Sequence, residues 1–135
     1  MGSPQLTVVV DTHAWVWFLT APDRLSVKAR EIIGGADKVF VPAIACWEVA
    51  LLVFRGHLEL SLPMGDWFDA AFTDSRFRIA PLTPAIAIRA VSLDWPHRDP
   101  ADRLIVATAL ELGAPLATRD ERITNAQIPG LLTAW

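Results

Sequence analysis

The sequence predicts an α/β fold in which helices cover both faces of a mostly parallel central sheet. Three observations lead to this prediction. Short β-branched runs, typical of buried strands, alternate along the chain with longer segments of helical periodicity. Proline, glycine and helix-capping residues separate these segments. The chain has 135 residues, 53% of them hydrophobic, which suits a single domain over residues 1–135 with a core of its own.

The first predicted strand is Leu6–Val10, a β-branched run that ends abruptly in an acid. A short helix, Ala14–Leu19, is expected next, with Trp15, Phe18 and Leu19 on one face. Ser26 is a suitable cap for a helix that runs to Ile33, and the following glycine pair ends it.

The long helix predicted over Ala43–Arg55 is apolar almost all round, so we expect it to be buried centrally. A strand over Lys38–Val41 precedes it. The later elements follow from cap-then-proline signatures and apolar runs. They are a helix from Pro63 to Phe72, a strand over Arg76–Leu82, a helix capped by Thr83, a helix capped by Asp99 and ending at Gly113, a strand over Pro115–Thr118, a loop or short helix over Arg119–Gln127, and a tail over Ile128–Trp135 that ends in a short strand.

The bulk composition limits the classes of function and the cellular location. The net charge is −3 and the pI about 5.5, whereas a protein that binds only the phosphate backbone is usually basic. The single cysteine, Cys46, allows no internal disulfide and indicates a reducing compartment. The longest apolar stretch, Ala43–Phe54, is shorter than the roughly 20 residues of a membrane span. We therefore expect a soluble, cytoplasmic protein without a membrane partner.

Two acids in the first half of the chain occupy unusual positions. Asp11 follows directly after a buried strand, where open α/β sheets bind ligands. Its structural alternative is a cap for the next helix. Glu48 is the sole charge between Lys38 and Arg55 in an otherwise apolar helix. A buried carboxylate must be paired, neutralised or bound to metal, so Glu48 either pairs with Arg55 on the same helix face or belongs to a cation site.

Three acids in the second half of the chain extend the pattern. Asp99 precedes a proline at a helix start, which is the position of an N-cap. Asp102 lies in the first turn of that helix, where the helix dipole favours an acid, and leads directly into a buried apolar run. We favour Asp102 as a ligand and Asp99 as a cap or outer-shell residue. Asp120 follows a predicted strand, either as a turn residue or as a further ligand.

The joint pattern indicates a cation site. Two unit charges about 4 Å apart repel by roughly 4 kcal/mol at an effective dielectric of about 20. Several such pairs would rival the ~5–15 kcal/mol stability of a whole domain, so converging acids need cations or protons. Oxygen ligands favour Mg²⁺ or Mn²⁺, and no histidine and cysteine set has zinc spacing. Such ions support phosphoryl chemistry.

The acidic motifs resemble those of PIN-domain nucleases, in the same order and over nearly the whole chain. The matching residues are Asp11-Thr12-His13, Trp47-Glu48-Val49, the run from Asp99 to Ala109, and Thr118-Arg119-Asp120. Length and motif set are most similar to the VapC toxins of bacterial VapBC toxin–antitoxin pairs. The resemblance implies a three-layer α/β/α fold, a Mg²⁺- or Mn²⁺-dependent endoribonuclease, a small antitoxin partner and a homodimer.

The resemblance also implies residue roles. Asp11, Glu48, Asp102 and Asp120 would form the catalytic and metal-binding site, with Asp11 and Asp102 as direct ligands. Outer-shell roles are expected for Asp99, Thr12 and Thr118. Apart from the resemblance, Arg103 and Arg119 flank the motifs and are expected to contact phosphates of the RNA substrate, although a solvated surface explains each equally well. His13 is expected either to contact the substrate or to be a turn residue. Asp99 adds a second acid to the third motif, so either Asp99 or Asp102 fits as the ligand.

Two other functions remain open at this stage. A Mg²⁺-dependent phosphatase of the haloacid dehalogenase type would need a second aspartate two residues after Asp11, where this chain has His13. A non-enzymatic partner-binding or dimerisation module would use the acids only as helix caps, and it predicts no stabilisation by metal.

Overall fold

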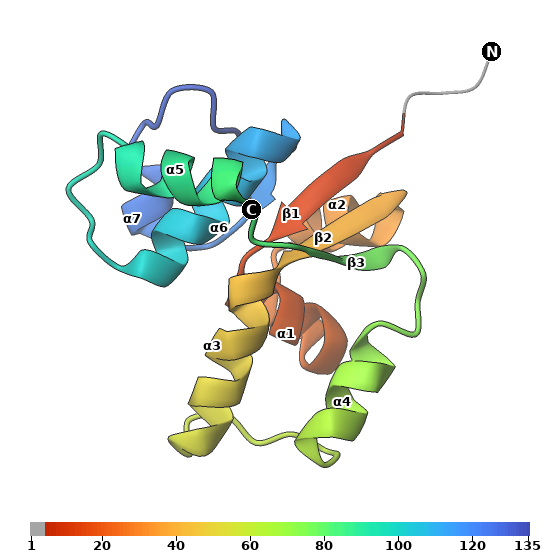
Figure 1. Cartoon of the computed structure of the whole chain (residues 1–135). Coiled ribbons are helices and arrows are strands. Elements are labelled where there is room, and N and C mark those ends of the chain that lie inside the picture. The colour runs from red at the N-terminus through yellow and green to blue at the C-terminus, as the bar shows by residue number, and fades with distance from the viewer. Residues whose placement is uncertain (1–4) are drawn as a thin grey trace.

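The computed structural model describes residues 5–135, so the first four residues of the predicted domain lie outside the described part. Its centre is a five-stranded sheet with the order β3-β2-β1-β4-β5, and every neighbouring pair is parallel (Figure 1). The strands are β1 (Thr7–Val10), β2 (Lys38–Pro42), β3 (Phe77–Ala80), β4 (Leu116–Ala117) and β5 (Thr133–Ala134). The predicted α/β class with a parallel sheet is therefore confirmed.

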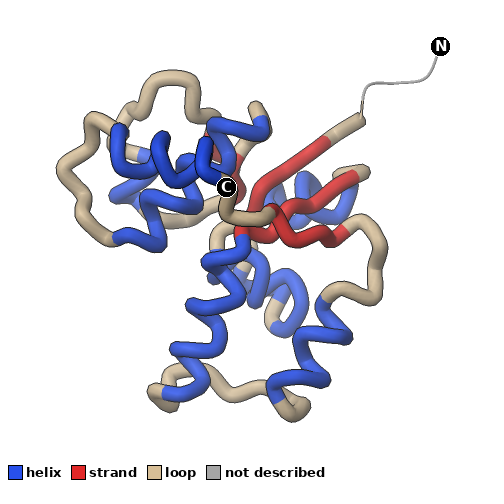
Figure 2. The backbone as a smooth tube through the Cα atoms, in the orientation of Figure 1, coloured by secondary structure: helices blue, strands red, loops and turns tan. Residues whose placement is uncertain are grey.

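Helices connect the strands and cover both faces of the sheet (Figures 1 and 2). In chain order they are α1 (Thr12–Thr20), the 3₁₀ turn η1 (Pro22–Arg24), α2 (Val27–Gly35), α3 (Ala43–Phe54), α4 (Met64–Ala71), α5 (Pro84–Ser92), α6 (Pro100–Leu112) and α7 (Glu121–Thr124). The predicted helix caps at Ser26, Thr83 and Asp99 accept hydrogen bonds from main-chain N–H groups in the first turns of α2, α5 and α6.

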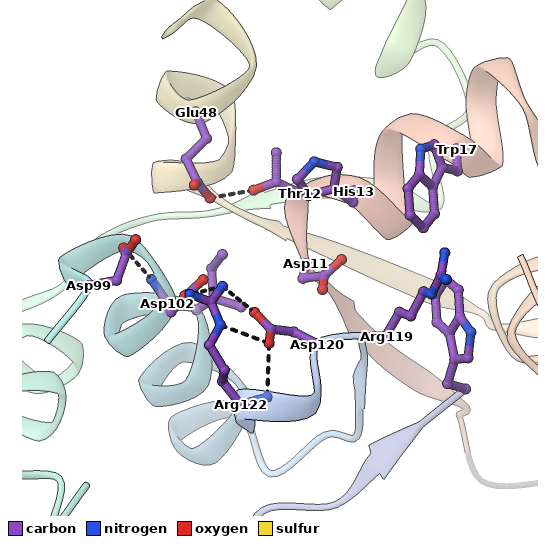
Figure 3. A pocket seen from close by; sticks show the side chains of 12 residues that line it. Asp11, Thr12, His13, Trp17, Glu48, Asp99, Asp102, Arg119, Asp120 and Arg122 are labelled. Carbon is purple, nitrogen blue, oxygen red and sulfur yellow. Dashed lines mark hydrogen bonds and ion pairs between the residues drawn. The ribbon is translucent and has the colours of Figure 1, made fainter. Parts of the chain in front are cut away.

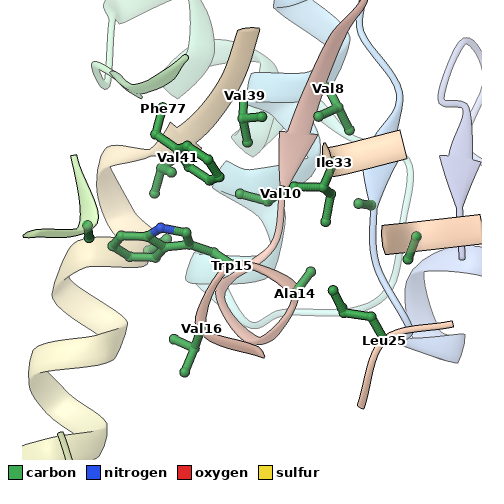
Figure 4. Packing of buried hydrophobic residues seen from close by; sticks show 14 of the residues in the cluster. Val8, Val10, Ala14, Trp15, Val16, Leu25, Ile33, Val39, Val41 and Phe77 are labelled. Atoms are coloured by element: carbon green, nitrogen blue, oxygen red, sulfur yellow. The ribbon is translucent and has the colours of Figure 1, made fainter. Parts of the chain in front are cut away.

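Alternating side chains of β1 separate two hydrophobic cores. Val8 and Val10 pack with α1, α2, α3 and α4 on one face of the sheet (Figure 4). Val9 faces the opposite side, where it packs with Ile105 of α6 and Ile123 of α7. This alternation follows from the two-residue period of a strand. It gives the three-layer α/β/α arrangement, with the sheet as the middle layer.

The prediction that the helix over Ala43–Arg55 is buried centrally is wrong. In α3 only Ala45 and Val49 are fully buried, whereas Trp47 is 57% and Phe54 is 88% exposed. The helix packs through one face against the rest of the protein, and its other face is apolar and faces solvent. The apolar residues all round α3 therefore form an exposed hydrophobic surface, and they do not place the helix at the centre of the protein.

Two smaller features complete the fold. In α1, Trp15 is fully buried but Leu19 is 38% exposed, so the predicted apolar face does not extend to the end of the helix. Among residues 5–135, no helix is long and apolar enough to cross a membrane.

The strand order places a topological switch point between β1 and β4. From β1 the chain adds β2 and then β3 on one side, and it later returns to place β4 on the other side of β1. The connections that leave β1 and β4 therefore diverge at the carboxyl ends of these strands. Open α/β sheets bind their ligands in the crevice at such a point.

Candidate active site

A cavity of about 420 Å³ opens at the switch point, and all five predicted acids line it (Figure 3). Figure 3 shows Asp11, Glu48, Asp102 and Asp120 converging on it from different elements. Asp11 follows β1, Glu48 lies on α3, Asp102 lies in the first turn of α6, and Asp120 precedes α7. The fold therefore brings together the acids that are scattered along the sequence.

Asp11 caps a helix and also lines the acidic cavity. It is the N-cap of α1, because one carboxylate oxygen accepts a hydrogen bond of 2.8 Å from the Ala14 N–H. Burial raises the pKa of its carboxyl, while hydrogen bonds from Thr118 and Ala14 lower it and the nearby Asp102 raises it. Asp11 is thus a capping residue whose ionised form is poorly solvated.

Glu48 is held by Thr12 rather than by an arginine. The Thr12 hydroxyl donates a hydrogen bond of 2.5 Å to a Glu48 oxygen. Within residues 5–135, no ion pair joins Glu48 to Arg55, so the proposed pairing along the helix does not form. Burial raises the pKa of Glu48, and the charges of Asp102 and Asp99 raise it further. Glu48 therefore faces the acid cluster without an arginine or lysine ion pair among residues 5–135, and only the charge of His13 offsets the effect of the neighbouring acids.

Asp99 and Asp102 perform different tasks although they lie one turn apart. Asp99 is the N-cap of α6 and accepts from the main-chain N–H groups of Ala101 at 2.9 Å and Asp102 at 3.3 Å. The Asp102 carboxylate lies 2.7 Å from Nε2 of His97. Burial raises the pKa of Asp102, the His97 contact lowers it, and Asp99 and Asp120 raise it. Asp99 thus satisfies the helix end, and Asp102 faces the cluster.

Asp120 is the best compensated acid of the cavity. It caps α7, and Arg122 donates to it through Nε at 3.1 Å and Nη2 at 2.7 Å. The same Nη2 lies 3.5 Å from Asp102. The hydrogen bonds from Arg122 lower the pKa of Asp120 despite partial burial. Arg122 therefore supplies part of the positive charge that this cluster requires.

The threonines next to the acids have fixed positions. Thr118 is fully buried after β4, and its hydroxyl accepts a hydrogen bond of 3.1 Å from the Asp120 N–H. Thr12 is buried at the start of α1 and orients Glu48. Both side chains therefore hold acids in place.

The chemistry of the donor set fits a divalent cation. Burial is the main cause of the raised pKa values of Asp11, Glu48 and Asp102, and the charge of at least one neighbouring carboxylate adds to each, so the ionised forms of these acids call for positive charge nearby. Ligand atoms of His97, Asp99 and Asp102 lie within 4.8 Å of one another. A set made mainly of oxygens, with one imidazole beside it, suits Mg²⁺ or Mn²⁺.

The residues expected to contact the substrate separate into two groups. His13 and Arg119 line the cavity. Arg103 is not among the residues that line it. Its guanidinium donates to main-chain carbonyls of Ala90 and Val91 at the end of α5, and of Leu93, Trp95 and His97 in the segment that follows. Arg103 therefore joins α6 to the end of α5 and to the loop between them, away from the wall of the acidic cavity.

Sequence reasoning missed three side chains of the site. His97 lies in a predicted loop, and its spacing of five residues before Asp102 was its sole signal. Trp17 and Trp135 line the cavity although they are 118 positions apart, and their rings lie 6.0 Å from each other. No local sequence pattern predicts a contact between two residues so far apart in the chain.

Comparisons with known proteins give matches over most of the chain. A family model described as PIN domain matches residues 8–128. Ribonuclease VapC22 of Mycobacterium tuberculosis is 37% identical over 131 residues, which cover 96% of this chain and 98% of that protein.

Solved structures at lower sequence identity show the same fold. VapBC2 from Rickettsia felis, bound to a DNA fragment from its promoter, gives a TM-score of 0.69 at 15% identity and covers 94% of this chain and 96% of that one. A toxin–antitoxin complex from Klebsiella pneumoniae gives 0.66 at 22% identity, with 93% and 96% covered. At these identities the likeness concerns the fold alone.

Proposed function

The chain belongs to the PIN-domain family, and from this membership we propose that it is a VapC-type ribonuclease, the toxin of a toxin–antitoxin pair. The observation that carries the proposal is the meeting of Asp11, Glu48, Asp102 and Asp120 in one cavity at the switch point. Burial raises the pKa values of Asp11, Glu48 and Asp102, so bringing these carboxylates together in their ionised forms is costly, and shifted pKa values of this kind are typical of functional sites. The substrate in this proposal is RNA, cleaved at a phosphodiester bond.

Asp11, Glu48, Asp102 and Asp120 would hold the divalent cation, Mg²⁺ or Mn²⁺. When bound, such a cation supplies Lewis acidity, an activated water and neutralisation of the charge that develops on the phosphate. Burial favours the protonated forms of Asp11, Glu48 and Asp102, so positive charge is needed to keep all of them ionised. The acids would therefore fill their role only in the loaded protein.

The remaining residues orient and bind. Asp120 has a lowered pKa and stays ionised at neutral pH, so it can accept a hydrogen bond from the attacking water. Thr12 fixes Glu48, and Thr118 fixes the main chain at Asp120. Arg119 on the cavity wall offers a guanidinium to the phosphate that would react. Precise placement of these groups is what makes a bound phosphodiester react.

Cleavage of a mixed RNA panel tests the proposal. The purified protein should cut RNA with Mg²⁺ or Mn²⁺ and not with EDTA, and Asp102→Asn should lower the rate by about 100-fold or more. Asp66→Asn is the matched control, because Asp66 is exposed on α4 and lies outside the acidic cavity. Metal-independent cutting, or equal rates for Asp102→Asn and Asp66→Asn, would contradict the proposal. No cutting and no thermal shift with metal would favour a binding module.

We also propose that a small antitoxin binds this protein and that the protein forms a homodimer. The support is the exposed apolar surface that includes Trp47 on α3 and Ile79, which is 50% exposed on the edge strand β3. A groove of about 580 Å³ lies between them. Light scattering on the wild type and on Trp47→Ser checks the dimer, which should dissociate more readily in the variant if this surface takes part.

A further inference from the structure

A second cavity adjoins the acidic one, and two side chains belong to the walls of both. The second cavity has a volume of about 430 Å³, and its wall includes Arg24 and His57. Trp17 and His13 line this cavity and also the acidic one. A chain-like ligand that leaves the acids would therefore pass over Trp17 before it enters the second cavity.

The ring of Trp17 is surrounded by cations and aromatic groups. The guanidinium carbons of Arg24 and Arg119 lie 5.7 and 5.9 Å from its centroid. The rings of His13 and Trp135 lie 5.5 and 6.0 Å away, both inclined to it. Figure 3 shows Trp17 and Arg119 on the same side of the acidic cavity, beyond His13. Half-buried Trp17 thus offers an aromatic surface with positive charge beside it.

Neither arginine has an acidic partner within residues 5–135. Arg24 and Arg119 are both exposed, and no ion pair joins either of them to a carboxylate of the described chain. Arg122, by contrast, is held by Asp120 and Asp102. The charges next to Trp17 therefore remain available to an anionic ligand, and Arg119 faces the acidic cavity whereas Arg24 faces the second one.

We propose that Trp17 is the stacking platform for an unpaired nucleobase of the RNA substrate, with Arg24 and Arg119 binding the phosphates on either side. This proposal rests on the proposed ribonuclease function and names a subsite of it. Stacking on an aromatic ring requires a base that is free of its own strand's stack, so the ligand is single-stranded RNA. A base on Trp17 would displace a guanidinium from the ring and leave it free to contact phosphate.

Binding of a fluorescent single-stranded 12-nucleotide RNA, measured by anisotropy in EDTA, tests the subsite without cleavage. Trp17→Leu should weaken binding by about tenfold, and Trp17→Phe should restore most of it, because phenylalanine can still stack. Phe54→Leu is the matched control, since it also removes an aromatic ring and Phe54 is 88% exposed and outside both cavities. An abasic oligomer of the same length should bind wild type and Trp17→Leu equally.

The outcomes separate a stacking role from other roles. Unchanged RNA binding by Trp17→Leu, or an equal loss for RNA and for the abasic oligomer, would overturn the proposal. If Trp17→Leu fails to fold, photo-crosslinking of 4-thiouridine RNA to the wild type decides. The crosslink should fall on the peptide that contains Trp17 or on its neighbours in space, and a crosslink confined to α5 would overturn the proposal.

The same experiments distinguish this proposal from the ribonuclease proposal. Base-dependent binding through Trp17 by a protein that cuts no RNA would leave the subsite intact and remove the ribonuclease function. If the protein cuts RNA with metal and Trp17→Leu changes neither KM nor kcat, the ribonuclease function would stand and the stacking subsite would be overturned.

Discussion

Arg122 shows how one side chain stabilises an acidic cluster from within the chain. Its guanidinium contacts Asp120 at 2.7 Å and Asp102 at 3.5 Å, although 61% of the side chain is exposed. Exposure weakens such contacts through solvent screening, so the pair contributes at most about 1 kcal/mol to stability. The guanidinium nevertheless contacts two of the carboxylates that would hold the divalent cation. Arg122 and the cation would therefore compete for Asp102 and Asp120.

We expect Arg122→Gln to bind metal more tightly than the wild type. Without metal, the variant should melt slightly lower, because Asp102 and Asp120 lose their partner. With Mn²⁺, its melting temperature should rise more than that of the wild type, since no internal cation has to be displaced. Differential scanning fluorimetry with and without Mn²⁺ measures both effects. An equal Mn²⁺ shift in the two proteins would show that Arg122 does not compete with the cation.

The raised pKa values of three acids give the metal-free protein a defined pH dependence. The pKa values of Asp11, Glu48 and Asp102 lie above their ordinary values of 3.8, 4.5 and 3.8, chiefly because of burial. The folded state therefore keeps protons that the unfolded chain has lost. The resulting stability is fully present below the ordinary pKa values and is lost as pH rises through the folded ones. The lowered pKa of Asp120 acts oppositely, but below its ordinary value of 3.8.

We therefore expect the melting temperature of the metal-free protein to fall as pH rises above the ordinary pKa values of these acids, 3.8 and 4.5. Asp102→Asn should flatten this dependence, because the amide does not titrate and relieves its neighbours of a negative charge. Thermal melts in EDTA across the pH range measure it. A melting temperature that rises with pH in this range would contradict the prediction, because it would mean that burial does not disfavour the ionised forms of these carboxyls.

At the scale of elements, the segment between α5 and α6 is held by one residue. Arg103 of α6 donates five hydrogen bonds at distances from 2.7 to 3.3 Å, three to carbonyls of this segment and two to carbonyls at the end of α5. The same segment carries His97, which contacts Asp102. A loop without regular structure is thus given a fixed path, and that path places the imidazole behind a carboxylate of the site.

We expect Arg103→Met to destabilise the protein by about 2 kcal/mol, because several carbonyls lose a charged donor. The loop should also loosen, so the Mn²⁺-induced rise in melting temperature should shrink as His97 leaves Asp102. Arg98→Met is the control, since Arg98 is exposed on the same segment. Urea unfolding gives the stability, and fluorimetry gives the response to metal. Equal stability of the two variants would contradict a structural role for Arg103.

At the scale of the whole molecule, the sheet joins two cores into one structure. Ile33 is fully buried in the core on one face of the sheet, and Ile105 is almost fully buried in the core on the other. β1 contributes side chains to both cores, and the acidic cavity opens where β1 and β4 end. The site therefore depends on both layers of helices at once.

We expect Ile33→Ala and Ile105→Ala each to lower the free energy of unfolding by about 2–5 kcal/mol. Because the two residues lie on opposite faces, their effects should be additive within about 0.5 kcal/mol in the double variant. Urea titrations followed by circular dichroism and by tryptophan fluorescence should coincide, as expected of one cooperative domain. Two separate transitions would instead mean that the layers unfold independently.

The sequence by itself determined the class of fold, the order of the elements and most helix starts. These features are local, because β-branched runs, caps such as Ser26 and Thr83, and prolines act on the residues next to them. The four acids of the cavity were also selected from local anomalies: a charge beside or within an apolar segment. Such anomalies are visible without coordinates because burying a lone carboxylate is costly in any fold.

Only the tertiary structure decided which faces and partners these residues have. Apolar composition could not show that α3 exposes Trp47, since packing against one neighbour leaves the other face free. The sequence could not assign Arg103 to a loop, Arg122 to Asp102, or Trp135 to Trp17, because these contacts depend on how the elements pack against one another. Local forces choose the elements, whereas distant contacts form only after the sheet has brought its carboxyl ends together.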